Sequence, residues 1–268
     1  MDKRIVLGAN RFQKLSQVEV DRVLYTALEL GIRQIDTAPT YATSEEKIGH
    51  FLARNHGAFE VRTKIFRDAS QVSLSLAQLS IEKSLKRLRV NQINTLYLHG
   101  THLGQNHSDI QSYLQQCESK KIVGRIGWCG NLSESTCLET DFYKSLMVRL
   151  NPWDEVIETR KDLLGKIDIT GMNIFANGFW NYQEWGRIRA FTAAHFRHEF
   201  NPAPSYYLDH PRKKEFEKYH DFKKLLFFAL SKKYLTDVVI GTTRESHLRS
   251  IVEWVRQFDM GPEARFLH

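Results

Sequence analysis

Four polar side chains whose types and spacing suit acid–base chemistry lie near the ends of predicted strands. Asp36, Lys64 and His99 end three successive strand-like segments, and Tyr41 follows shortly after Asp36. A tyrosine of ordinary pKa, about 10, is a poor proton donor at neutral pH. We expect the Lys64 ammonium to lower that pKa by stabilising the phenolate, and Asp36 to anchor the ammonium. With His99 orienting a substrate oxygen, these groups would protonate a carbonyl oxygen while another group delivers a hydride.

Each of these residues also has an ordinary structural explanation when it is taken alone. A strand-ending Asp favours a turn, a Lys is usually solvated, and a lone His is more often a structural hydrogen-bonding residue. The chemical interpretation therefore depends on whether the strands end at one common edge, which is a question about the fold.

Strand-like and helix-like patterns alternate along the whole chain. The predicted strands are residues 5–7, 33–36, 60–64, 94–98, 125–129, 146–150, 172–176 and 237–240. The predicted helices are residues 18–30, a helix opened by a capping box between Thr43 and Glu46, residues 74–88 and 108–120, a helix capped by Ser133, and residues 154–164 and 245–258. Eight such units predict one α/β domain over residues 1–268, a (β/α)8 TIM barrel. In such barrels the carboxyl ends of the strands hold the active site, so the four polar residues should converge there.

Several segments of the chain resemble the aldo-keto reductase family. The resemblance is carried by residues 31–41 (GIRQIDTAPTY), 44–49 (SEEKIG), 63–64 (TK), 84–88 (SLKRL), 96–99 (LYLH), 125–129 (RIGWC) and 239–242 (VIGT). It covers most of the chain in the right order and is most specific in the first half. It implies a catalytic tetrad of Tyr41, Asp36, Lys64 and His99, with Tyr41 as the general acid in reduction and the base in oxidation.

The same resemblance implies a nicotinamide cofactor, usually its phosphorylated form, NADP. In that family the cofactor lies extended across the barrel mouth, so no Gly-x-Gly-x-x-Gly fingerprint is needed, and the chain contains none. The implied cofactor contacts are Cys129, Asn131, Arg149, Asn177, Gly178, Gly241, Thr242, Thr243, Arg244 and His247.

Some of these positions differ from the family pattern. Cys129 stands where the family has Ser, Asn131 comes one residue late, and Arg149 replaces a Gln. Ser250 and Ile251 occupy the usual Glu-Asn adenine contacts. At the start of the last helix, the free N–H groups and an Arg244 guanidinium would suit a phosphate, although a simple helix cap with a solvated Arg explains the same residues.

The composition indicates a globular chain whose charge is spread over its surface. Lys and Arg number 38 against 31 Asp and Glu, a formal net charge of +7, which would permit a nucleic-acid partner. The densest basic cluster, residues 212–224, also contains acidic residues, so we favour a solvated helix face. The longest apolar run, residues 225–230, is far shorter than the roughly 20 residues of a membrane span. We therefore expect a small-molecule carbonyl substrate, without nucleic-acid or membrane partners.

The cysteine, histidine and aromatic residues suggest no additional cofactor site. The three cysteines, an odd number, form no Cys-x-x-Cys pair, and the N-terminus has no signal-peptide pattern, so we expect a cytoplasmic protein. His99 and His102, with His107 nearby, lack the carboxylate of a zinc motif, and we expect no metal. The aromatic stretch 179–211 is expected to be an enlarged loop that packs on the barrel or walls a substrate pocket.

Two other function classes stay open on these residues. The altered cofactor positions would suit a cofactor-sensing or scaffold barrel with little turnover. The tetrad itself would also serve a cofactor-independent lyase or isomerase.

Overall fold

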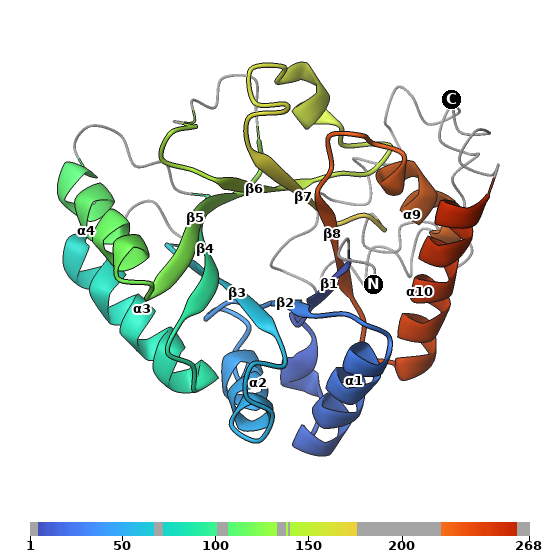
Figure 1. The fold of residues 1–268 in the computed structure, drawn as a ribbon, viewed down its shortest axis with the longest axis horizontal. Coiled ribbons are helices and arrows are strands. Elements are labelled where there is room, and N and C mark those ends of the chain that lie inside the picture. Colours follow the sequence, from blue (N-terminus) through green and yellow to red (C-terminus); the bar gives the residue numbers. More distant parts are fainter. Residues whose placement is uncertain are drawn as a thin grey trace, which may run out of the picture.

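The eight strands of the protein close into a barrel. The computed structural model describes residues 5–66, 72–100, 107–132, 138, 140–175 and 221–261. Each strand pairs in parallel with the next in sequence, and β1 pairs with β8 to complete the ring (Figure 1). The strands are β1 Ile5–Gly8, β2 Gln34–Asp36, β3 Glu60–Ile65, β4 Ile93–His99, β5 Val123–Gly130, β6 Ser145–Arg149, β7 Asp168–Met172 and β8 Asp237–Gly241. The predicted (β/α)8 TIM barrel is confirmed, whereas the assignment of all 268 residues to one domain stays a prediction.

The helices lie outside the ring of strands (Figure 1). They are α1 Gln17–Glu29, α2 Ser44–Leu52, α3 Leu74–Leu88, α4 Ser108–Ser119, α9 Phe222–Leu230 and α10 Glu245–Met260. Within the described residues, none of these helices is long and apolar enough to cross a membrane.

Two predicted elements around β7 differ from the structure. The predicted helix over residues 154–164 is a short 3-10 helix, η4 Val156–Thr159, followed by turns. The seventh strand is residues 168–172 rather than 172–176, and it ends where Asn173 takes a left-handed φ of 57°. Only Ile169 of this strand is a large apolar core residue, and Thr170 bonds to a polar group inside the barrel, so the strand lacks the apolar run that sequence patterns detect.

The alternating side chains of the strands form two separate apolar cores. Outward residues such as Leu7, Ile35 and Ile126 belong to a large core between the strands and the helices. Inside the barrel, Tyr97, Cys129 and Met147 form a small separate cluster. Stability therefore rests mainly on the outer face of the sheet, and the inner face is free to hold polar groups.

The amino end of α2 differs from the predicted capping box. Thr43 makes no side-chain capping bond, and the capping box of the structure lies at Ser16 and Glu19, at the start of α1. The first turn of α2 buries an acidic residue, Glu45. Its carboxylate accepts a hydrogen bond of 2.7 Å from Thr63 on β3 and pairs with Arg87 on α3 at 2.6 Å. Glu45 thus ties two helices to the residue that precedes Lys64.

A close backbone contact between α2 and α3 gives a test of this packing. A Cβ added at Gly49 would lie 2.0 Å from the carbonyl oxygen of Arg87. We predict that Gly49→Ala lowers the free energy of unfolding by about 1–3 kcal/mol, because the two helices must move apart. Urea denaturation measures this, with the exposed His50→Ala as the matched control, expected within about 0.5 kcal/mol of the wild type. Equal stability of Gly49→Ala and the wild type would contradict the contact.

Candidate active site

A buried ion pair joins β2 and β3 at the carboxyl ends of the strands. The Nζ atom of Lys64 lies 2.6 Å from Oδ1 and 2.7 Å from Oδ2 of Asp36, and it donates to the carbonyl oxygen of Thr37 at 2.9 Å. Lys64 is 2% exposed and Asp36 is 3% exposed. These three contacts match the three donors of the ammonium, so its position is fixed in all directions.

Tyr41 is held above this ion pair by a short turn. Its backbone N–H donates to the carbonyl of Ala38, and its carbonyl accepts from the N–H of Ser44, both at 3.0 Å. The Lys64 Nζ atom lies 5.3 Å from the centroid of the Tyr41 ring. The phenol therefore lies beside a fixed ammonium.

His99 and Cys129 extend the same rim. They end β4 and approach the end of β5 as register partners, and both side chains are buried. The Cys129 thiol is within electrostatic reach of Lys64 and Tyr41, and burial raises its pKa to about 12. The thiol is therefore neutral at physiological pH.

Sharp turns follow several of the residues at this rim. Ala42 follows Tyr41 with a φ of 46°, Phe66 follows β3 with 56°, and Gly100 follows His99 with 69°. Left-handed backbone costs free energy for residues other than glycine and often occurs at functional sites. Backbone of this kind therefore occurs close in sequence to Tyr41, Lys64 and His99.

The pKa of Tyr41 differs from the expectation drawn from the sequence. Burial raises it to about 12, and although the Lys64 ammonium lowers it, the Asp36 carboxylate raises it again. The expected net lowering of the Tyr41 pKa is therefore wrong, because burial outweighs the ammonium and Asp36 offsets part of the effect of the ammonium. Burial lowers the pKa of Lys64, but the charge of Asp36, the neighbouring Tyr41 and Cys129 and the hydrogen bond to Asp36 together outweigh burial. The net pKa is raised, so Lys64 stays charged.

The predicted cofactor residues that the structure describes lie at the same end of the barrel as the tetrad. Gly241 ends β8 and is exposed, and Thr242 accepts a hydrogen bond from the N–H of Arg244 at 3.2 Å. Arg244 and His247 are exposed at the start of α10, and Thr243 is half-buried. Asn131 is exposed directly after β5, and Arg149, at the end of β6, is 3.9 Å from Asp154. Asn177 and Gly178 lie outside the described residues, as do residues 179–211 and His102.

The sequence and the fold both match known proteins. A family model described as Aldo/keto reductase family matches residues 4–259. The chain belongs to the aldo-keto reductase family. No curated protein matches it closely in sequence.

Among solved structures, it is similar to the aldo-keto reductase AKR11C1 from Bacillus halodurans in its holo form, with 16% identity and a TM-score of 0.73 over 98% of this chain and 89% of that one. It is also similar to the glycerol dehydrogenase AKR11B4 from Gluconobacter oxydans, with 20% identity and a TM-score of 0.69 over 99% of this chain and 90% of that one.

Membership of the aldo-keto reductase family makes the protein a carbonyl oxidoreductase, and members of this family use a nicotinamide cofactor. At these low identities the two structures themselves support the fold. Among the described residues, no group of three or more His, Cys, Asp or Glu side chains is placed to hold a metal ion.

Two residues important to this aldo-keto reductase site were missed in the sequence. Arg62 lies two residues before Lys64, and so on the same inward face of β3, where it is 4% exposed. Glu45 reads as a first-turn acidic residue, yet it is fully buried against β3. The period-2 pattern of the strand could have revealed Arg62, whereas nothing in the sequence distinguishes Glu45 from its exposed neighbour Glu46.

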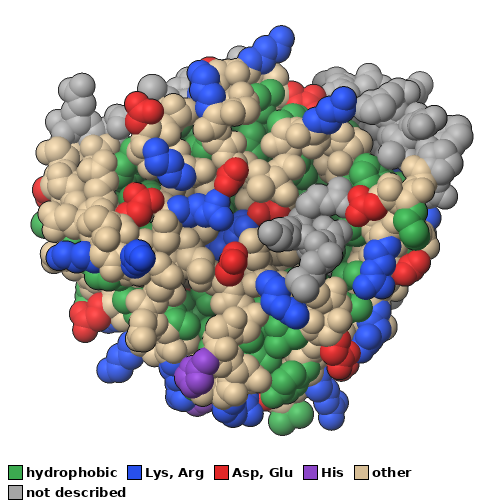
Figure 2. All heavy atoms as spheres, viewed as in Figure 1, with side chains coloured by type: hydrophobic (Ala, Val, Ile, Leu, Met, Phe, Trp, Pro, Cys, Tyr) green, Lys and Arg blue, Asp and Glu red, His purple; other side chains and the backbone are tan. Residues whose placement is uncertain are grey.

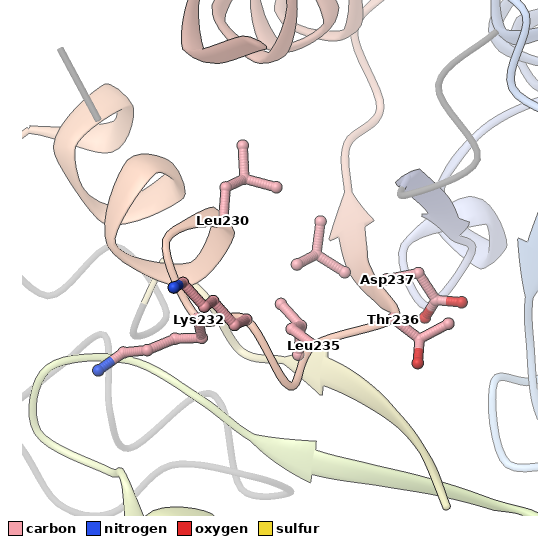
Figure 3. Close-up of a pocket in the computed structure, with 7 residues that line it drawn as sticks. Leu230, Lys232, Leu235, Thr236 and Asp237 are labelled. Carbon is pink, nitrogen blue, oxygen red and sulfur yellow. The ribbon is translucent and has the colours of Figure 1, made fainter. Parts of the chain in front are cut away.

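A cavity of about 190 Å³ lies at the opposite end of β8 from the tetrad. Figure 3 shows Thr236 and Asp237 at its edge, where β8 begins, with Leu230, Lys232 and Leu235 around it. Because aldo-keto reductases and other barrel enzymes work at the carboxyl ends of the strands, this cavity is not the candidate active site.

Charged side chains of both signs lie on the surface of the protein. On the face shown in Figure 2, Lys and Arg side chains lie scattered among Asp and Glu. Several are paired, such as Arg54 with Asp21 at 2.6 Å and Arg249 with Glu29 at 2.8 Å. On this face the excess of basic residues is general surface charge.

The raised pKa of Tyr41 can be measured directly. We predict that its phenol keeps its proton up to about pH 11, because its pKa is about 12 instead of the ordinary 10. The ultraviolet difference spectrum of tyrosinate, wild type minus Tyr41→Phe, should show no ionisation of this residue between about pH 8 and 11. A phenolate signal from Tyr41 near pH 8 would show that the ammonium dominates over burial.

Proposed function

We propose that this protein reduces the carbonyl group of a small aldehyde, ketone or sugar-like substrate, with NADPH as the hydride donor and Tyr41 as the proton donor. The observation that carries the proposal is the Lys64 ammonium, bonded to both oxygens of Asp36 at 2.6 and 2.7 Å and lying 5.3 Å from the centre of the Tyr41 ring. The two free and buried cysteines of the described residues suit a reducing compartment, and we place the protein in the cytoplasm.

Tyr41 supplies the proton in this scheme. Its raised pKa keeps the proton on Oη at neutral pH. The bound cofactor supplies a hydride to the carbonyl carbon. As the carbonyl oxygen becomes an alkoxide, it grows more basic than a phenolate, so the proton moves from Oη of Tyr41 to that oxygen.

Lys64, Asp36 and His99 support this transfer. The Lys64 ammonium stabilises the phenolate that Tyr41 leaves behind, and Asp36 keeps the ammonium in place. His99, buried at the end of β4, would donate a hydrogen bond that orients the carbonyl oxygen. In the oxidation direction the Tyr41 phenolate takes up the alcohol proton.

The residues at the end of β8 fit a phosphate-bearing cofactor. Gly8 and Gly241 are register partners at the ends of β1 and β8, so the backbone there is not covered by their side chains. Arg244 makes no side-chain cap to α10, and a helix amino end attracts anions through its N–H groups and dipole. Arg244 and His247 are three residues apart and exposed on the first turn, where they could hold the additional phosphate of NADP.

The role of Tyr41 can be tested by removing only its hydroxyl group. We predict that Tyr41→Phe lowers kcat for carbonyl reduction by about 10²- to 10⁴-fold, the usual contribution of a general acid. Its Kd for NADPH should stay within about twofold of the wild-type value, since the cofactor contacts remain. NADPH absorbance reports turnover and NADPH fluorescence reports binding, with the exposed Tyr25→Phe as the control.

The outcomes of this experiment separate the alternatives. Retained reduction in Tyr41→Phe would disprove the proton-donor role. A wild type that binds NADPH but reduces no carbonyl would support a cofactor-sensing barrel, and activity unchanged by cofactor removal would support a lyase or isomerase. Absence of NADPH binding would overturn the proposed function altogether.

The preference for NADP can be tested at Arg244. We predict that Arg244→Gln raises the Kd for NADPH by about tenfold and leaves the Kd for NADH within about twofold, because a charged hydrogen bond to a phosphate is lost. Fluorescence titration with both cofactors measures this, and Arg256→Gln, exposed further along α10, is the control. An equal loss for NADPH and NADH would contradict recognition of the additional phosphate.

A further inference from the structure

A second buried ion pair lies inside the barrel beneath the first. Nη2 of Arg62 lies 2.6 Å from Oδ2 of Asp237 on β8, and Nη1 lies 3.1 Å from Oδ1 of the same carboxylate. The guanidinium also donates to Gln34 on β2 at 2.6 Å and to Thr170 on β7 at 3.0 Å. Both side chains of the pair are only 5% exposed. Arg62 therefore spans the barrel interior and points away from the mouth.

This arginine has an alternative partner close by. Arg62 and Asp36 are register partners on the neighbouring strands β3 and β2, and register partners on adjacent parallel strands are about 5 Å apart. A guanidinium can bond either carboxylate, since its forked donors match both. The observed pairing leaves both oxygens of Asp36 to Lys64.

The electrostatic influence of the two groups on Asp36 fits this competition. Burial and Lys64 have the largest effects on the pKa of Asp36, and after them Arg62 lowers it and Asp237 raises it. The charges of Arg62 and Asp237 thus shift the pKa of Asp36 in opposite directions. Without the negative charge of Asp237, the guanidinium would be an uncompensated cation beside the Lys64–Asp36 pair.

We propose that Asp237 is a positioning residue for the reaction, which holds the Arg62 guanidinium across the barrel and thereby reserves Asp36 for Lys64. This inference rests on the proposed function, because Lys64 must stay charged and in place beside Tyr41. Asp237 lies at the amino end of β8, far along the strand from the reacting groups, and acts on them through Arg62 and Asp36.

The proposal predicts that the two halves of one ion pair differ in their effect on catalysis. Asp237→Asn releases the guanidinium toward Asp36 and weakens the hold of Asp36 on Lys64. Arg62→Gln removes the competing cation and leaves the Lys64–Asp36 pair intact. Both variants lose a buried ion-pair partner and should lose stability. If the Arg62–Asp237 pair were purely structural, the two substitutions would instead lower kcat equally.

Steady-state carbonyl reduction tests this asymmetry. We expect Asp237→Asn to lower kcat by about tenfold or more with little change in KM, because the loss falls on the transition state. Arg62→Gln should keep kcat within about threefold of the wild type, and the double variant Arg62→Gln/Asp237→Asn should return to that level, because the competing cation is gone. Equal losses of kcat in both single variants, or a double variant no better than Asp237→Asn, would overturn the proposal.

Crystal structures of the same variants give a result that does not depend on activity. In Asp237→Asn the Arg62 guanidinium should bond Asp36 and the Lys64–Asp36 contact should lengthen. An unchanged Lys64–Asp36 contact in that variant would overturn the proposal even if the wild type reduced no carbonyl. If Asp237→Asn does not fold, the kcat of Arg62→Gln tests the proposal instead. A tenfold loss of kcat in folded Arg62→Gln would overturn it.

Discussion

The buried ion pair between Lys64 and Asp36 is the interaction on which the site depends. Removing two charges from water costs several kcal/mol for each ion, and the cost is recovered only when the geometry is close and every donor is used. Here the ammonium has three acceptors within 2.9 Å, and both partners are almost completely buried. The pair is therefore sensitive to the relative position of β2 and β3, and the barrel that aligns these strands is part of the chemistry.

The outward face of the strands contributes most to stability, and the inward face carries the charged groups of the site. The outward side chains form the large apolar core with the helices, and the inward side chains form two layers of paired charges around a small apolar cluster. The interior is tightly filled, since a Cβ on Gly127 would lie 2.6 Å from the Tyr97 ring. Two cations and two carboxylates therefore share one filled interior, and each cation has its own carboxylate there.

The sequence was sufficient for the barrel and for the convergence of Asp36, Tyr41 and Lys64, because apolar periodicity marks strands and parallel strands end at one rim. The sequence was insufficient where a strand, a pKa or an ion pair depends on residues that are distant along the chain. The strand β7 is hard to detect in the sequence because most neighbours of Thr170 and Gly171 come from distant parts of the chain. Burial of Tyr41 reverses the expected direction of its pKa shift. The partner of Arg62 is 175 residues away in sequence, and no local pattern indicates it.

The central claim is that the fixed ammonium and the protonated phenol meet a substrate carbonyl. A crystal structure of the protein with NADP and an unreactive carbonyl analogue tests this most directly. The account predicts the carbonyl oxygen within about 3 Å of Tyr41 Oη and of a ring nitrogen of His99, with the Lys64–Asp36 pair unchanged. A carbonyl oxygen bound out of reach of Tyr41, with the analogue still at the barrel mouth, would contradict it.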